Sequence, residues 1–204
     1  MITNYDGLDL GRYMKIDKIL RTPAEEIDKQ VQIVAILADK TTDEVLALPI
    51  AEYSRMAAQT AFLGRLCEPA PEDGKPFEAG GLRLVPTGDF TKINTAQYVD
   101  FQTFAKDFPS TIPQLLSCFL VPEGKDYNQG YDIAAVHQAV LSIPLAKALG
   151  LTAFFFSRFN ESIAGSLTSL ERQSRKNRRK KMEVEMMKAK VEGLLRSIGD
   201  GLPT

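Results

Sequence analysis

Two helix starts lie close together in the stretch that decides the fold class, residues 22–48, TPAEEIDKQVQIVAILADKTTDEVLAL. At the first start, Thr22 stands at the N-cap position, Pro23 at the first helical position, and Glu25 three residues after the threonine. This combination is typical of a helix N-terminus. The spacing of the apolar residues then predicts an amphipathic helix to about Asp39. Its predicted buried face consists of Ile27, Val31, Val34, Ala35 and either Leu37 or Ala38.

The second start repeats the signature nineteen residues further on, with Glu44 three residues after Thr41. A threonine and a glutamate at this spacing form a capping box, in which each side chain binds the backbone of the other residue. A short helix is therefore expected as far as Leu48, where Pro49 interrupts it, and a further helix over residues 51–63.

Apolar periodicity and capping residues predict helices in most of the remaining chain. With an apolar fraction of 44% in 204 residues, the chain can bury a sizeable core. We therefore expect a mainly α fold: a multi-helix globular domain at residues 1–165 and a basic, helical C-terminal extension at residues 166–204. The further predicted helices cover residues 10–20, 95–108, 113–121, 132–140, a segment opened by Pro144 with a break at Gly150, and one long helix over 151–170.

One short segment alternates as a strand does. Leu82–Pro86 reads apolar, basic, apolar, apolar, proline, and it follows a loop at residues 68–81 that holds three prolines and three glycines. Phe90–Ile93 lies across the turn Thr87-Gly88-Asp89. The sequence thus predicts one small β-hairpin near residues 82–93.

The net charge of −1 conceals an uneven distribution. Residues 1–171 carry 15 lysines and arginines against 22 acidic residues, whereas residues 172–204 carry 10 against 4. An acidic body with a basic tail points to a polyanion or an acidic surface as a partner.

The basic residues of the tail are concentrated in one run of ten, seven of which are Lys or Arg. They are candidates for binding phosphate backbones, since each neutralised phosphate releases counterions. The run contains no aromatic residue, so it offers no base stacking. A solvated helical face that docks on the acidic body is the alternative interpretation. The seven residues are Arg172, Arg175, Lys176, Arg178, Arg179, Lys180 and Lys181.

After the basic run, five apolar residues follow at alternating intervals of three and four. This spacing is that of a coiled-coil seam about two heptads long. Two heptads are marginal alone, so the seam is expected to pair with a partner helix or with a copy of itself in a homo-oligomer. Its members are Val184, Met187, Val191, Leu194 and Ile198.

The residue types that carry most enzyme chemistry are scarce. His137 is the only histidine, and the two cysteines, Cys67 and Cys118, lie in unrelated apolar contexts. Zinc sites need Cys and His at close spacing, and neither a phosphate loop nor a Gly-x-Ser-x-Gly elbow occurs. Residues 126–132 lack the alternating acidic ligands of a calcium loop. We therefore expect no catalytic, metal or cofactor site and no enzyme. A hydrolase with a dispersed site is the weakest alternative.

The distribution of apolar residues along the chain bears on whether the protein is inserted in a membrane or secreted. No stretch approaches the length of apolar chain that a membrane-spanning helix requires. Residues 1–10 lack a basic start followed by an apolar run, as a secretory signal would have. The expectation from sequence is a soluble protein with reduced thiols and no membrane partner.

Several of these segments together resemble a group of small helical proteins found in tailed phages and prophages, similar to tail-assembly chaperones and other small morphogenesis or structural proteins. The resemblance covers roughly Leu10 to Phe156. It implies phage or virion proteins as partners, a location in the bacterial host cytoplasm or in the virion, and no catalytic residues. The segments are residues 10–16, 27–37, 42–45, Leu48-Pro49, 95–101 and 115–122.

Overall fold

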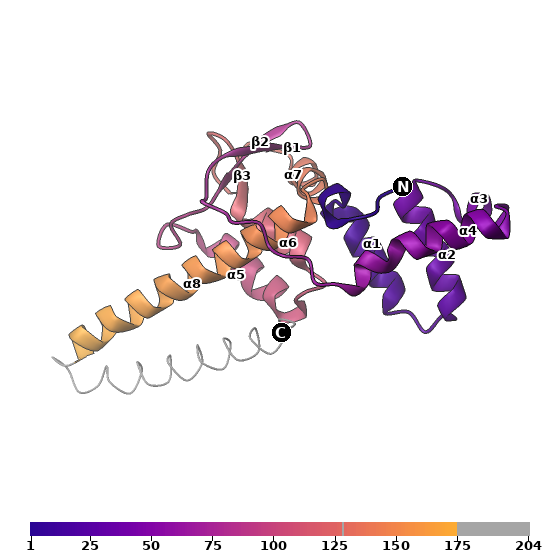
Figure 1. Ribbon diagram of the computed structural model, residues 1–204. Helices are drawn as coiled ribbons and strands as arrows, with labels where there is room; N and C mark the ends of the chain where they lie inside the picture. The colour runs from indigo at the N-terminus through magenta and orange to yellow at the C-terminus, as the bar shows by residue number, and fades with distance from the viewer. Residues whose placement is uncertain (128, 175–204) are drawn as a thin grey trace.

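The computed structural model describes residues 1–127 and 129–174. Within these residues it contains eight α-helices and one small three-stranded sheet, so the prediction of a mainly α fold is confirmed. Helices α1 to α4 form one end of the molecule, and the sheet lies at the other end together with the later helices (Figure 1). The N-terminal helices are α1 (Leu10–Leu20), α2 (Glu26–Ala38), α3 (Thr42–Leu46) and α4 (Ile50–Ala58), preceded by the 3-10 turn η1 (Tyr5–Gly7) and followed by η2 (Gln59–Gly64).

The first helix start of the opening stretch was predicted three residues too early. Helix α2 begins at Glu26, and its N-cap residue Glu25 makes no capping bond through its side chain. The Thr22 hydroxyl instead donates to the carbonyl oxygen of Ile19, at 2.7 Å. Thr22 therefore satisfies an orphan carbonyl at the end of α1 rather than the first amides of α2.

The second helix start is confirmed. The Glu44 amide donates to the Thr41 hydroxyl at 3.2 Å, and the Thr41 amide donates to the Glu44 carboxylate at 2.6 Å, which is the reciprocal pair of a capping box. Just before it, Asp39 ends α2 in the left-handed region with φ of 56°. The turn that joins α2 to α3 is thus built by local chemistry.

The predicted strand Leu82–Pro86 is present as β2, but its partners differ from the predicted one. It pairs antiparallel with β1 (Phe77–Ala79) on one side and with β3 (Leu120–Pro122) on the other. The hairpin turn is Gly80-Gly81, where both residues have positive φ, as a tight two-residue hairpin requires.

Phe90–Ile93 forms no strand because Asp89 closes a turn there: the Thr91 amide donates to the Asp89 carboxylate at 3.0 Å, and the Lys92 amide donates to the Asp89 carbonyl at 3.2 Å. Phe90 is 7% exposed, and its ring centroid lies 4.8 Å from that of Phe119. The hairpin predicted near residues 82–93 is therefore a hairpin over residues 77–86.

The helices of the sheet end begin largely where their capping residues predict. Asn94 caps α5 (Thr95–Phe104), and Asp132 caps α7 (Ile133–Leu141). Helix α6 (Ile112–Phe119) carries the most continuous buried face, and its chain runs directly into β3. The short 3-10 turn η3 (Ala105–Asp107) follows α5.

Helix α8 (Leu145–Ser174) is continuous through Gly150 and Gly165, so no break occurs at Gly150. It crosses residue 165, where the sequence places the start of an extension, and that division stays a prediction. Phe155 and Phe156 are buried, as expected from their apolar cluster, whereas Phe154 is half-buried. Their rings join those of Phe101, Phe119 and Phe159 in an aromatic core.

Two core clusters hold the described chain together. The larger one extends from α1 and α2 through α6 and α7 to α8. A second, small cluster lies among α2, α3 and α4 and contains Val31, Val34, Ala35, Val45 and Met56. The predicted apolar face of α2 is thus buried from Val31 onward, while Ile27 is 57% exposed. This part of the prediction was wrong because Ile27 lies one turn before the first residue of α2 that joins either cluster.

Candidate interaction surfaces

The residues predicted from the sequence to bind polyanions fall almost entirely beyond the described chain. Arg172 belongs to the last turn of α8, and the other six basic residues of the run lie outside the described residues. The same is true of the predicted seam, Val184 to Ile198. Polyanion binding and seam pairing therefore stay predictions.

Among the residues that the structure describes, His137 has a polar contact with Ser117, at 3.4 Å between Nδ1 and Oγ. The Ser117 hydroxyl donates its proton to the carbonyl oxygen of Pro113 at 2.8 Å. A serine nucleophile would instead give its proton to the histidine, which a third group would orient. The pair thus joins α6 to α7 structurally. Within residues 1–127 and 129–174, no group of three His, Cys, Asp or Glu side chains could hold a metal ion.

The second cysteine belongs to a buried polar cluster. Burial raises the pKa of the Cys118 thiol to about 12, so the reactive thiolate is scarce at neutral pH. The Tyr127 hydroxyl donates to Asp100 at 2.7 Å and lies 3.8 Å from the Cys118 sulfur. Nearby, Gln97 is 4% exposed and donates through Nε2 to the Cys118 carbonyl at 2.7 Å. These bonds fasten α5 to α6 and to the loop after β3.

A groove of about 870 Å³ runs beside α1. Its far side is formed by Ser110, by Gln138 and Leu141 of α7, and by Ser142, the C-cap residue of α7. Four cations and two carboxylates line it on the side of α1, so the groove is net positive on an acidic body. The six charged residues are Arg12, Lys15, Lys18 and Arg21 with Asp9 and Asp17.

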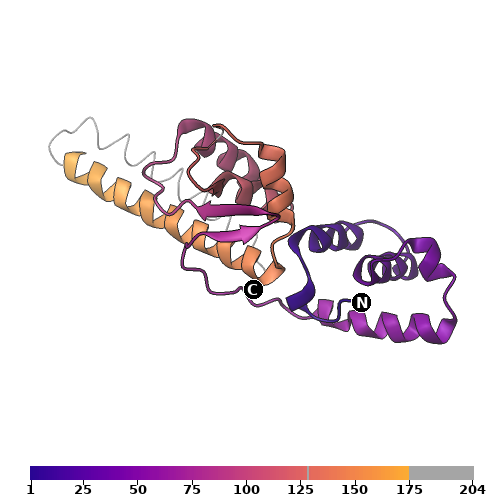
Figure 2. The same cartoon turned by 90° about the horizontal axis from the view of Figure 1, so that it is seen from above.

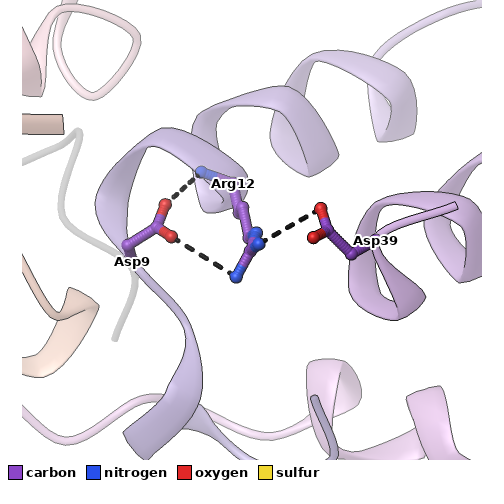
Figure 3. A network of polar contacts seen from close by, with 3 residues as sticks. All are labelled: Asp9, Arg12 and Asp39. Carbon is purple, nitrogen blue, oxygen red and sulfur yellow. Dashed lines mark hydrogen bonds and ion pairs between the residues drawn. The ribbon is translucent and has the colours of Figure 1, made fainter. Parts of the chain in front are cut away.

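Two of the four cations are neutralised by local ion pairs. Arg12 lies 3.7 Å from Asp9 and 3.3 Å from Asp39, as Figure 3 shows, and Arg21 lies 2.8 Å from Asp17. Lys15 and Lys18 are exposed and make no ion pair with any residue that the structure describes. They are the free charges of the groove. The sequence signal for it is a basic residue at every third position from 12 to 21, which the longer run in the tail obscured.

A second set of exposed residues, apolar and acidic, belongs to helices α2, α3 and α4. Ile27, Leu46 and Ile50 are 57%, 66% and 77% exposed and belong to α2, α3 and α4 in turn. Acidic residues, all exposed, flank each of them within three positions in the sequence. We call this set the α2–α4 surface, made up of Ile27, Leu46 and Ile50 with Glu25, Glu26, Asp28, Asp43, Glu44 and Glu52.

The positions of these acids follow from helix chemistry. Glu26 and Asp28 lie in the first turn of α2, Asp43 and Glu44 in that of α3, and Glu52 in that of α4. Carboxylates are favoured there by the positive end of the helix dipole. The sequence predicts Glu25 and Glu44 as capping residues and Ile27 as a core residue. It therefore gives no sign of an exposed apolar side chain beside these acids.

No family model, curated protein or solved structure matches this chain. Among the described residues, none of the helices is long and apolar enough to cross a membrane.

Proposed function

We propose that this chain is a non-enzymatic morphogenesis or virion structural protein of a tailed phage or prophage, similar to a tail-assembly chaperone. It acts through protein–protein contacts, in the cytoplasm of a bacterial host or within the virion. The resemblance of residues 10–156 to such proteins motivates the proposal, and the scarcity of catalytic residue types agrees with it.

The observation that carries the protein–protein part is the distribution of exposed apolar side chains. Six of the nine large apolar residues that the described chain exposes fall within its first 66 positions. Full burial of one Leu or Ile side chain contributes roughly 1.5–3 kcal/mol. A partner that covered Ile27, Leu46 and Ile50 would bury the exposed part of each side chain, and each burial would contribute part of this free energy to binding. The α2–α4 surface is therefore the proposed contact.

Genomic context gives the first test. Genes for tail or capsid proteins beside the gene for this chain are expected. A location within a metabolic operon on every genome that carries the gene would contradict the proposal.

The contact itself is tested by complementation. A phage or prophage from which the gene is deleted should recover particle production with the wild-type chain but not with the double variant Leu46→Asp/Ile50→Asp. Ile133→Asp is the matched control, because Ile133 is also about half exposed, at 52%, and lies in α7 outside the surface. Full recovery with the double variant would overturn the α2–α4 surface as the contact.

Mass spectrometry of purified particles then separates the two roles. A stoichiometric amount of the chain in finished particles identifies a virion component. Its absence from particles whose assembly requires it identifies a transient assembly factor.

Binding of nucleic acid is the alternative function. The specific observation in its favour is that the groove beside α1 adds Lys15 and Lys18 to the basic run of the tail. Titration of duplex DNA and RNA at two salt concentrations tests it, since phosphate contacts weaken steeply as salt rises. At the same salt concentration, the double variant Lys15→Glu/Lys18→Glu should bind the nucleic acid more weakly than the wild-type chain does. Absence of salt-sensitive binding by the full chain would end this alternative.

A further inference from the structure

We propose that the α2–α4 surface of one copy binds the basic C-terminal segment, residues 172–198, of a second copy. The contact is head-to-tail, because it joins two different regions of the same sequence. This inference concerns self-association through the surface that the proposed function assigns to protein–protein contacts. Its test does not depend on whether the protein belongs to a phage.

Charge complementarity is the first argument. Four of the six carboxylates on the α2–α4 surface make no ion pair with any described residue and lack a hydrogen bond that engages them: Glu25, Asp28, Asp43 and Glu52. Of the other two, Glu26 lies 2.9 Å from Lys29, and Glu44 is held in its capping box, which lowers its pKa and keeps it ionised. The C-terminal segment offers seven Lys or Arg within ten residues, 172–181.

Apolar complementarity is the second argument. Ile27, Leu46 and Ile50 are the exposed apolar residues among these acids. The C-terminal segment likewise follows its basic run with apolar residues, Val184 to Ile198, at intervals of three and four. The acidic and apolar residues exposed on α2, α3 and α4 therefore have a basic and apolar counterpart within the same chain.

The direction of α8 explains why the occupant comes from another copy. Its first residue is bonded to the N-terminal region, since the Leu145 amide donates to the Leu8 carbonyl at 2.8 Å. From there α8 leads away from α2, α3 and α4 (Figures 1 and 2). Its 30 residues cover about 45 Å at the helical rise.

The basic run that follows α8 is too short to return. Seven residue steps separate Ser174 from Lys181, and they span at most about 25 Å. The basic run cannot reach back past the start of α8 to the α2–α4 surface of its own molecule. That surface is within reach of the segment of a neighbouring molecule.

A head-to-tail contact of this kind leaves one surface and one segment free in every dimer. Repeated association therefore builds rings or open chains. A symmetric pairing of two seams would instead stop at a dimer.

The test measures self-association of the full chain by sedimentation velocity over a range of concentrations. Wild type should associate beyond a dimer at low salt and dissociate as salt screens the charges. The surface variant Leu46→Lys/Ile50→Lys and the tail variant Arg178→Glu/Arg179→Glu/Lys180→Glu/Lys181→Glu should each raise the dissociation constant about tenfold or more, equivalent to about 1.4 kcal/mol. Ile133→Lys serves as the control and should associate like wild type.

Mixing the two variants gives the decisive result. The tail variant retains an intact surface and the surface variant an intact segment, so their mixture should form a heterodimer and nothing larger. Far-ultraviolet circular dichroism and thermal melts verify that each variant is folded. Wild type that stays monomeric at low salt, a surface variant that associates as wild type does, or a mixture without heterodimer would each overturn the proposal.

Discussion

Gly150 and Ala70 approach each other so closely that no side chain fits between them. A Cβ atom on Gly150 would lie 1.9 Å from the carbonyl oxygen of Ala70. The Ala70 amide donates to the Ala146 carbonyl at 2.8 Å, so the extended segment after η2 is bonded to the first turns of α8. The glycine is retained inside a long helix for packing, although glycine weakens helix interiors.

We therefore expect Gly150→Ala to destabilise the protein by about 1–3 kcal/mol, the usual cost of overpacking, against the intrinsic helix preference for alanine. Urea unfolding followed by circular dichroism measures the difference. Gly64→Ala is the matched control, because nothing lies within 4 Å of its added Cβ, and it should be close to neutral. A stabilised Gly150→Ala variant would show that the two segments separate easily.

The two glycines of the hairpin turn should differ in how much an alanine substitution destabilises the protein. Gly80 and Gly81 have φ of 54° and 77°, so alanine is strained at both. Only at Gly80 does the new Cβ also meet a neighbour, the Cα of Ala139 in α7 at 2.6 Å. Gly80→Ala should cost at least about 1 kcal/mol more than Gly81→Ala in urea unfolding. Equal costs would mean that the turn does not pack firmly on α7.

The contacts of Arg12 allow the contribution of a helix cap to stability to be compared with that of a surface ion pair. The Arg12 amide donates to the Asp9 carboxylate at 2.7 Å, which caps α1, whereas Asp39 is largely exposed where it faces the guanidinium. Asp9→Ala should cost about 1 kcal/mol. Asp39→Asn keeps a residue that tolerates positive φ and loses only a surface ion pair, so it should cost less than about 1 kcal/mol. Thermal melts in low and high salt check the ranking, and a larger loss for Asp39→Asn would contradict it.

The two thiols should differ in reactivity. Cys118 is buried with its pKa raised to about 12, while Cys67 is half-buried and its pKa is raised by a smaller degree of burial. Alkylation at mildly alkaline pH should modify Cys67 first and Cys118 only after unfolding, as mass spectrometry of timed samples would show. Equal labelling rates of the two thiols in the native protein would contradict the burial of Cys118.

The raised pKa of Cys118 also makes stability depend on pH. Because folding raises the Cys118 pKa, the protonated thiol favours the folded state. That contribution is complete below the ordinary thiol pKa and is lost as pH rises from there toward 12. Cys118→Ala should remove this part of the dependence of the free energy of unfolding on alkaline pH.

The amino-acid sequence alone predicts most of the helices and several of their ends. The Thr41–Glu44 box and the caps at Asn94 and Asp132 act over three residues, so local spacing was enough to predict them. It also showed the contrast between an acidic body and a basic tail, and the shortage of catalytic residue types.

Which segments meet depends on packing between residues far apart in the chain, and local patterns do not indicate it. Thr22 matches the sequence signature of a cap for α2, yet its hydroxyl serves α1. The partner strands of β2 come from residues 77–79 and 120–122, and the second of these lies too far along the chain for any local pattern to indicate the pairing. Ile27 has the spacing of a core residue, but in the folded chain it is 57% exposed. The spacing of residues in the sequence predicts on which face of a helix a side chain lies. Whether that side chain is buried depends on whether another helix or strand packs on that face.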